Sequence, residues 1–411
     1  MKPTVLVATT NRWFPTVRLA IALTNAGCTV EAVCPPRHPF SKISSVRRKF
    51  VYRGLWPLAS FASAIAAVHP DLIIPGDDRA VQHLHALYDR ERRGGNAGRL
   101  ICSLIERSLG ASESFPVVYH RSKFLELAEQ EGIRVPKTAV VSDTNDLEKW
   151  GDRFGFPLVL KANGSSGGDG VRVAHTQEEA RRALRTLQAP PLLARAAKRA
   201  LIDRDSTLIG PSLLRRRSVV NAQAFVPGGE ATSAVACWKG VVLAELHFEV
   251  LKKSNLAGPA TVVRLVENGE MSRTAERMVR RLNLSGLHGF DFILEEHTGS
   301  AHLIEINPRT TQVGHLRLGP GRDLPAALYA VVSGEALQTA PRITQNDTIA
   351  LFPREWLRDP DSPFLQSGYH DVPWEEPDLV RECVRTREKQ WVRYSKEKGL
   401  QASPVVRLPH L

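Results

Sequence analysis

Residues 157–173 read PLVLKANGSSGGDGVRV, which is a strand pattern, a glycine-rich loop and a second strand pattern. The first strand leads from Lys161 into the loop, and four glycines fall within seven positions: Gly164, Gly167, Gly168 and Gly170. Backbone that lacks Cβ atoms can bring its N–H groups close to phosphate oxygens, and a fixed lysine adds a compact positive charge. The stretch therefore predicts a phosphate-binding hairpin.

Two other motifs fit this stretch less well. It is not a P-loop, because no Gly-Lys-Ser/Thr follows and the loop opens into a strand. Residues 164–168 fit GxSxG, the nucleophile elbow of serine hydrolases, but an elbow needs a helix after the turn, and here a strand follows. A flexible connection without any ligand is the remaining alternative.

The second informative stretch is GFDFILEEHTGSAHLIEINPR, residues 289–309, which has the pattern of a β-hairpin. A turn about Thr298 places Asp291 opposite Glu305, with Asn307 on the same face because side chains alternate along a strand. Opposed carboxylates repel each other unless a cation lies between them, and oxygen ligands favour Mg²⁺ over zinc. The hairpin therefore predicts a magnesium site; a solvated acidic pair is the alternative.

Pro308 ends this second strand, and Arg309 then brings a forked cation to the same place. A phosphate loop, Lys161, a metal site and Arg309 together favour a nucleoside triphosphate with Mg²⁺ as the ligand.

The composition is that of an ordinary globular protein. The 411 residues suggest two or three domains, and 43% are hydrophobic and 24% charged. The net charge of +12 suits an anionic partner, but no long block of Lys and Arg is present, which favours a soluble enzyme from a proteome with a basic bias.

The cysteines and the hydropathy pattern point to a cytoplasmic protein. The 5 cysteines are scattered and form no CxxC, so neither a disulfide framework nor a zinc site is expected. The start of the sequence lacks the pattern of a signal peptide. The longest stretch without charge, residues 55–68, is 14 residues long, whereas a membrane span needs about 20.

The first 110 residues alternate between strand and helix patterns. Strands are predicted at 4–8, 29–33 and 71–74, with helices at 16–26 and around Phe61. This order predicts a parallel sheet with crossover helices. No GxGxxG follows the first strand, which argues against a dinucleotide, and the last strand breaks into the acidic pair at 77–78.

From about residue 113 the pattern changes to mixed helices and strands. Helices are predicted at 122–132, around Leu147, at 176–187, 272–282 and 323–332, and strands at 157–162, 171–173, 219–226, 233–238, 241–250, 290–294 and 301–306. Residues 190–218 are basic and irregular, so a solvated loop is predicted there and a phosphate-facing patch is the alternative.

On these motifs, residues 113–335 resemble the ATP-grasp superfamily, and within it the carbamoyl-phosphate synthetase and biotin carboxylase branch. The resemblance implies an α/β and α+β fold with a Rossmann-like pre-ATP-grasp lobe at 1–112. A two-subdomain ATP-grasp domain at 113–340 follows, divided into 113–188 and 189–340, and then a C-terminal extension at 341–411.

The resemblance also implies roles for individual residues. Lys123 and Lys161 would contact the nucleotide phosphates, together with the glycine loop. The backbone of Gln223, Ala224, Phe225 and Val226 would read the adenine edge, although the family more often has Glu at the first of these, and Glu230 would lie near the ribose. Asp291, Glu305 and Asn307 match the Mg²⁺ ligands, and Arg309 matches the cation over the transferred phosphoryl group. Lys252 or Lys253 would belong to a mobile loop over the phosphate.

The implied activity is ATP-dependent ligation of a small carboxylate to an amine or thiol through an acyl phosphate. ATP and Mg²⁺, with Mn²⁺ as a substitute, would be the cofactors. No membrane or nucleic-acid partner is expected, and a homodimer is compatible with the sequence. A non-catalytic ATP-binding or sensing module is the alternative function, and nucleic-acid binding through the basic loop and tail is a third.

Overall fold

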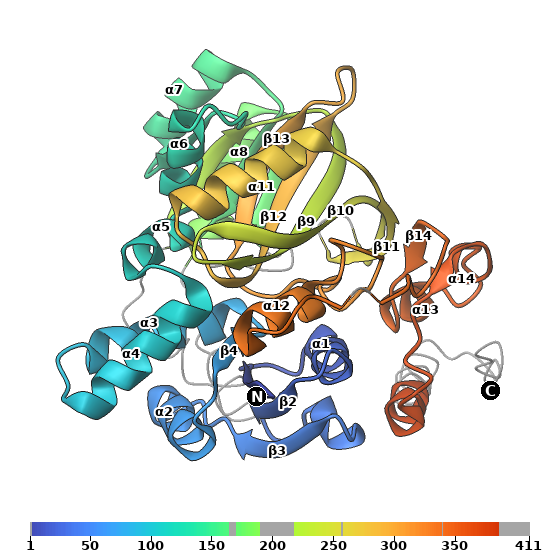
Figure 1. Cartoon of the computed structure of the whole chain (residues 1–411). Coiled ribbons are helices and arrows are strands. Elements are labelled where there is room, and N and C mark those ends of the chain that lie inside the picture. Colours follow the sequence, from blue (N-terminus) through green and yellow to red (C-terminus); the bar gives the residue numbers. More distant parts are fainter. Residues whose placement is uncertain (1, 164–169, 190–217, 256–257, 339, 386–411) are drawn as a thin grey trace, which may run out of the picture.

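The first part of the chain folds around a sheet of four parallel strands. The computed structural model describes residues 2–163, 170–189, 218–255, 258–338 and 340–385 (Figure 1). The strands lie in the order β3-β2-β1-β4 and are β1 (Thr4–Ala8), β2 (Thr29–Cys34), β3 (Val46–Val51) and β4 (Leu72–Pro75). The three predicted strands are confirmed to within one residue, whereas β3 was not predicted.

Helices cover both faces of this sheet, which is why its central strands are buried throughout. They are α1 (Pro15–Asn25), α2 (Pro57–Val68), α3 (Asp78–Glu91) and α4 (Asn96–Leu109). The side chain of Asp77 caps α3 by accepting a hydrogen bond from the Ala80 N–H. The acidic loop predicted after the last strand is thus the start of a helix.

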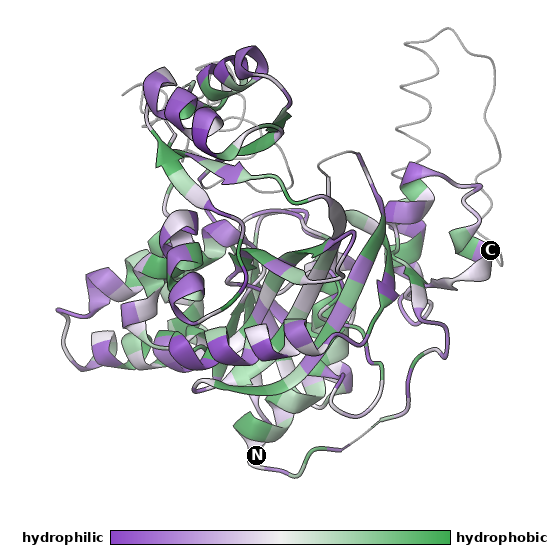
Figure 2. Ribbon diagram, turned by 90° about the horizontal axis from the view of Figure 1, so that it is seen from above, coloured by the Kyte–Doolittle hydropathy of each residue, from purple (hydrophilic) through white to green (hydrophobic). Residues whose placement is uncertain are grey.

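A small antiparallel sheet follows and stands apart from the body of the molecule (Figure 2). Its strands lie in the order β5-β8-β6-β7 and are β5 (Thr138–Val141), β8 (Val220–Ala224), β6 (Leu158–Ala162) and β7 (Val171–Ala174). The helices α7 (Thr144–Phe154) and α8 (Gln177–Gln188) pack against it, and Thr176 caps α8 as predicted. β8 ends at Ala224, two residues before the predicted end of that strand.

The largest sheet has seven strands in the order β13-β12-β9-β10-β11-β14-β15. They are β9 (Gly228–Trp238), β10 (Val241–Lys253), β11 (Ala260–Leu265), β12 (Gly286–Glu295), β13 (Ala301–Asn307), β14 (Thr348–Ala350) and β15 (Tyr369–His370). The last two strands come from beyond residue 340, so part of the segment assigned to an extension completes this sheet.

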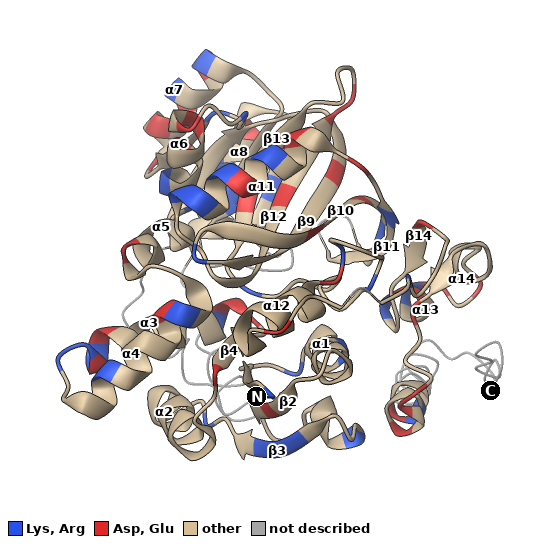
Figure 3. Cartoon of the chain, viewed as in Figure 1, with Lys and Arg blue, Asp and Glu red and all other residues tan. Residues whose placement is uncertain are grey.

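The helix α11 (Gly269–Arg281) covers one face of the large sheet. Its Ala275, Met278 and Val279 are fully buried, as the helical spacing predicted. Figure 3 shows basic residues along the exposed side of this helix. The pattern is that of an amphipathic helix packed on a sheet.

The opposite side of the large sheet packs against the N-terminal lobe. A single apolar cluster joins Val17 and Leu19 of α1, Leu328 of α12 (Leu324–Ser333), and Leu246 and Phe248 of β10. The lobe and the large sheet therefore share a core, and residues from both can meet at one site. In the described part of the chain, no helix is long and apolar enough to span a membrane.

The remaining helices are short connections. They are α5 (Phe115–Tyr119), α6 (Arg121–Gln130), α13 (Arg354–Arg358) and α14 (Phe364–Ser367). The first two join the N-terminal lobe to the small sheet, and the last two flank the short strands at the end of the large sheet. α6 also packs on β13, which places its buried side next to the predicted metal hairpin.

Candidate active site

A cavity of about 1040 Å³ lies where the N-terminal lobe, the small antiparallel sheet and the large sheet meet. Thr10 and Asp78 line it from the lobe, Lys161 from the small sheet, and Asp291 and Glu305 from the large sheet. Lys161 and the acidic pair, which lie more than 120 residues apart in the sequence, thus border one cavity.

The hairpin of β12 and β13 has the predicted pairing at the site. Asp291 pairs with Glu305, and Gly289 pairs with Asn307. The register shifts by one residue immediately after Asp291, a shift that the sequence did not predict. A Cβ atom on Gly289 would lie 2.3 Å from Cγ2 of Thr311, so a larger residue here would force the Thr311 side chain to move.

Asp291 is half-buried and is held by two side chains. Thr232 donates to Oδ1 and the Asn307 amide donates to Oδ2, each over 2.8 Å. Burial and the charge of Glu305 raise the pKa of Asp291 to about 6, although the two hydrogen bonds and Arg309 oppose the rise. A cation between the two carboxylates would relieve their repulsion, so the donor set of Asp291, Glu305 and Asn307 fits an oxygen-coordinated divalent ion.

Arg309 leaves β13 directly beside these residues. Its Nη2 donates to Oδ1 of Asn307 over 3.0 Å, and its Nε donates to Oδ1 of Asp78 over 2.9 Å. The guanidinium carbon lies 5.3 Å from the centre of the Trp13 ring, a cation–π distance. Arg309 is therefore fixed by the hairpin on one side and by the N-terminal lobe on the other.

Lys161 lies near the end of β6 and is only 6% exposed. Burial, followed by the nearby Arg121, lowers its pKa to about 8, while Glu305 and Asp291 act in the opposite direction. Negative charge nearby, such as that of a phosphate, would stabilise the protonated form of this buried lysine.

Arg121, at the start of α6, lines the cavity. Arg121 is 9% exposed and binds Oε2 of Glu305 over 2.8 Å. Its Nε and Nη1 have no partner among the described residues. Lys123 is exposed and does not line the cavity, because it lies on the outer side of α6. Of these two residues, Arg121 and not the predicted Lys123 lines the cavity.

The segment predicted to bind adenine lines the opposite wall of the cavity, with Gln223, Ala224, Phe225 and Val226. The Gln223 amide donates to Oγ1 of Thr138 over 3.0 Å, so this side chain ties β8 to β5. Glu230 also lines the cavity, and it accepts a hydrogen bond from Nζ of Lys253 over 2.6 Å. Lys252 and Lys253 lie at the end of β10, close to this wall.

The glycine loop is described only at its end. Gly164, Gly167 and Gly168 lie outside the described residues, as does almost all of the basic region 190–218. Gly170 is described, and its carbonyl accepts a hydrogen bond from the Ala162 N–H over 2.9 Å. Lys161 pairs with Val171 across an antiparallel hairpin, so a strand follows the loop and the context of a nucleophile elbow is absent.

The chain is similar in sequence to known ATP-binding domains. Residues 120–316 match the family described as the ATP-binding domain of the carbamoyl-phosphate synthase L chain. The carbamoyl phosphate synthase large chain of Saccharolobus solfataricus is 24% identical over 230 residues, which are 53% of this chain and 20% of that one. The matched segment thus spans about a fifth of the length of that relative.

Solved structures share the fold over most of the chain. The biotin carboxylase domain dimer of the 2-oxoglutarate carboxylase from Hydrogenobacter thermophilus, solved with MgADP, ADP and bicarbonate, has a TM-score of 0.58 and 16% identity, with 83% of this chain and 72% of that one covered. The N5-carboxyaminoimidazole ribonucleotide synthetase of Thermus thermophilus has a TM-score of 0.56 and 17% identity, with 82% and 80% covered.

The family match covers the stretch that contains Lys161, the acidic hairpin and Arg309, and the structural match extends over the lobe before it. Over residues 120–316 the chain is therefore similar to the ATP-grasp family described as the ATP-binding domain of the carbamoyl-phosphate synthase L chain, and it shares its fold with the two solved structures named above.

Proposed function

We propose that this protein is an ATP-dependent ligase that joins a small carboxylate to an amine or thiol and releases ADP and phosphate. The observation that carries the proposal is the acidic pair Asp291 and Glu305, which lies with Asn307 and Arg309 on one wall of the cavity that Lys161 also borders. An ATP-binding module without catalysis would not need this set of oxygen ligands and a fixed guanidinium.

The site residues divide between binding and chemistry. Lys161, Arg121 and the glycine loop would hold the phosphates, the segment 223–226 the adenine, and Glu230 the ribose. Asp291, Glu305 and Asn307 would hold Mg²⁺, which supplies charge neutralisation at the terminal phosphates. Mn²⁺ would substitute because it accepts the same oxygen ligands.

The reaction needs positioning and electrostatic stabilisation more than a protein nucleophile. A carboxylate oxygen of the substrate attacks the γ-phosphorus, the bond to the β,γ-bridging oxygen breaks, and ADP leaves. The amine nitrogen then attacks the acyl carbon and displaces phosphate. Arg309 would stabilise the negative charge on the transferred group during the first step.

The domain assignment follows the same proposal. Residues 1–112 would form the Rossmann-like lobe that precedes ATP-grasp domains, 113–188 and 189–340 the two subdomains around ATP, and 341–411 an extension that contributes β14 and β15 to the large sheet. Because the Hydrogenobacter domain is a dimer, we propose a second copy of this chain as an assembly partner.

The proposal is tested by measuring ADP release with pooled L-amino acids and small carboxylates. ADP and phosphate should accumulate in equal amounts only when a carboxylate and an amine or thiol are both present. Release of AMP and pyrophosphate would contradict a ligase of this class. So would ADP release at the same rate with and without the two substrate pools.

Binding of ATP should take up a proton above pH 8. Because the pKa of Lys161 is lowered to about 8, its amine is mostly neutral at pH 8.5, and phosphate beside it favours the protonated form. Affinity should therefore fall by up to about tenfold per pH unit above pH 8. Calorimetry in two buffers of different ionisation enthalpy measures the uptake. Lys161→Arg, which stays charged, should abolish it, and equal heats in both buffers for the wild type would refute it.

Asp78→Asn should lower turnover about tenfold, with a much smaller change in the KM for ATP. The substitution removes the charge that fixes Nε of Arg309 but leaves the metal ligands intact. Asp89→Asn, an exposed change on the same helix α3, is the matched control and should behave as the wild type. A raised KM at unchanged turnover would show that Asp78 supports binding instead of positioning Arg309.

A further inference from the structure

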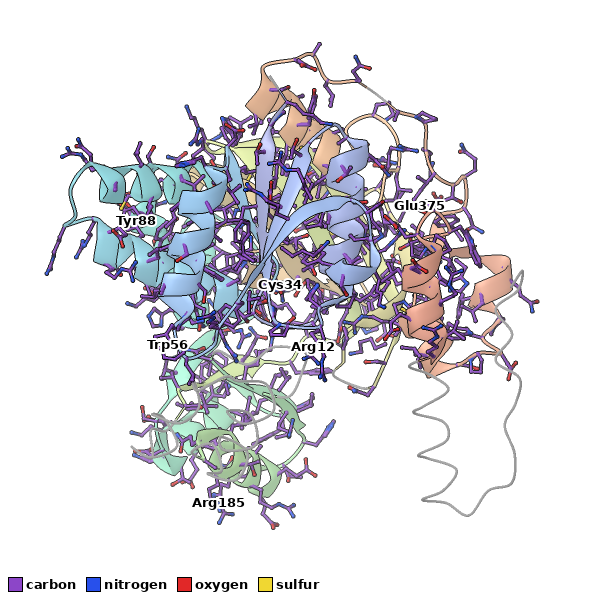
Figure 4. The ribbon with its side chains drawn as sticks, turned by 90° about the horizontal axis from the view of Figure 1, so that it is seen from below. Arg12, Cys34, Trp56, Tyr88, Arg185 and Glu375 are labelled. Carbon is purple, nitrogen blue, oxygen red and sulfur yellow. The ribbon has the colours of Figure 1, made fainter. Side chains whose placement is uncertain are left out.

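A second cavity, of about 570 Å³, lies away from the acidic hairpin. It is bordered by α1 of the N-terminal lobe, by α12 and by the chain that follows β15. Figure 4 shows Glu375, one of its lining residues, where the C-terminal segment meets the N-terminal lobe. The volume lies within the usual range for small-molecule sites, roughly 300–1,000 Å³.

One wall of this cavity is a buried cluster of charged side chains. Asp371 is 1% exposed and accepts from Nη2 of Arg18 over 2.5 Å and from Nε2 of His315 over 2.7 Å. Burial alone would raise the pKa of Asp371, but Arg18 and His315 lower it to about 2. The carboxylate is thus ionised and fully engaged by its two partners.

The two partners of Asp371 keep unused polar atoms. Nε of Arg18 and Nδ1 of His315 are buried, and neither has a hydrogen-bond partner among the described residues. The side chains of Arg18 and His315 are 9% and 5% exposed, and both line the cavity. Buried polar atoms without partners are rare in native proteins, because each loses its hydration without compensation. The wall of the cavity thus contains two side chains whose hydrogen-bonding capacity is not fully used by the described residues.

The remaining wall carries charges of both signs. Arg317 uses Nε to bind the carbonyl of Pro341 over 3.0 Å, which leaves its other nitrogens for a ligand. Asp323 uses Oδ1 to cap α12, which leaves its other oxygen for a ligand. Their backbones form an isolated antiparallel bridge, so the cation and the anion stand side by side. Glu375 adds a second carboxylate 3.5 Å from Nη1 of Arg18.

We propose that this cavity binds a small zwitterion that carries both a carboxylate and an ammonium group, the chemistry of an amino acid or a short peptide. Arg317 and Arg18 face the carboxylate, and Asp323 and Glu375 face the ammonium. Arg18 already pairs with Glu375, and the charge of Arg317 acts on Asp323. A ligand with only one charged group would draw one member out of such a pair and leave the other without a partner, whereas a zwitterion satisfies both. This inference does not depend on the proposed ligase activity.

The position of the cavity connects it to the catalytic region. His315 and Arg317 lie six and eight residues after Arg309 in the same stretch of chain, which is held by backbone hydrogen bonds from Leu316 to Val313 and from Leu318 to Arg322. A bound zwitterion would therefore contact the segment that leads from the acidic hairpin. The cavity is suited to an effector site.

The test is calorimetric binding to the full chain, with L-alanine, L-glutamate and L-lysine as probes and with propionate and propylamine as single-charge controls. At least one amino acid should bind at millimolar concentration or below, whereas propionate and propylamine should not. Arg317→Ala should weaken this binding by about tenfold or more, since it removes charge-assisted hydrogen bonds. Asp323→Asn should do the same while keeping the cap of α12, because Asn caps helices as well as Asp.

Two control variants separate this cavity from the catalytic one. Arg322→Ala removes a neighbouring arginine that pairs with Glu267 outside the cavity, and Glu305→Gln changes the acidic hairpin; both should bind the amino acid as the wild type does. The inference is overturned if none of the three amino acids binds, or if binding survives in both Arg317→Ala and Asp323→Asn. Loss of binding in Glu305→Gln alone would assign the amino acid to the catalytic cavity instead.

Discussion

Glu305→Gln is expected to lower turnover by about 10²-fold or more while ATP still binds. The substitution keeps the size of the side chain but removes one of the two charges that face each other across β12 and β13. It also removes a cause of the raised pKa of Asp291, so the remaining carboxylate would ionise more readily. The adenine wall is untouched, and the substitution releases Arg121 from its ion pair with Glu305 for contact with phosphate. Ground-state affinity should therefore change far less than rate.

The measurement is ADP release across a Mg²⁺ titration, together with calorimetry of ATP binding. Excess Mg²⁺ should restore only part of the activity, because a neutral amide is a weaker ligand than a carboxylate. Glu295→Gln, at the far end of the same hairpin, is the matched control and should retain full activity. Wild-type turnover of Glu305→Gln at every Mg²⁺ concentration would show that this carboxylate does not hold the metal.

The acidic hairpin was predictable because its signals are local. A turn near Thr298 and the alternation of side chains place Asp291 opposite Glu305, and the structure has this pairing. The register shift just beyond Asp291 carries no such signal, since one extra residue in a strand leaves the apolar pattern nearly unchanged. The sequence therefore predicts the pairing of the two carboxylates but not the register shift beside them.

Arg121 could have been found from the helical periodicity. It precedes Phe124 by three residues and Leu125 by four, and both are buried, so it lies on the inner side of α6. Lys123 falls on the outer side of the same helix. The family resemblance pointed to Lys123 as a cavity residue, whereas the helical periodicity predicts that Arg121 faces inward.

Strand β3 was missed because it lies at the edge of its sheet and has an unusual composition. Its centre is Arg47, Arg48 and Lys49, which are largely exposed, and the two arginines bind the buried Glu31. Such a segment has neither the continuous apolar run of a central strand nor clear alternation. Its pairing with β2 depends on a partner strand that the local pattern does not reveal.

Contacts between the lobes have no local signal at all. Asp78 and Arg309 are 231 residues apart, and Arg18 and Asp371 are 353 apart. Each pair forms only after the N-terminal lobe packs on the large sheet through the shared apolar core. Asp78, which holds Nε of Arg309, could therefore be identified only in the folded structure.

Arg309→Lys is expected to bind ATP normally and to lose about 10²–10³-fold in turnover. Arginine makes three separate contacts here: Nε with Asp78, Nη2 with Asn307 and Nη1 with the carbonyl of Thr310. A lysine ammonium keeps the charge but cannot occupy these positions at once, so it would be drawn toward Asp78 or Asn307. The interaction between the guanidinium and the transferred phosphoryl group strengthens as negative charge develops on that group. Its loss should therefore lower the turnover rate more than the affinity for ATP.

The decisive measurement for Arg309 follows the oxygen atoms of the substrate. If the carboxylate attacks the γ-phosphorus, a carboxylate labelled with ¹⁸O must pass one labelled oxygen into the released phosphate. The wild type should show this transfer, and Arg309→Lys should show it at the same ratio to product but far more slowly. Arg322→Lys, a change at an arginine outside the cavity, is the control for the substitution itself. Unlabelled phosphate alongside normal product formation would exclude an acyl phosphate. A normal rate for Arg309→Lys would show that the forked guanidinium does not stabilise the transferred phosphoryl group, which would remove Arg309 from the phosphoryl-transfer step.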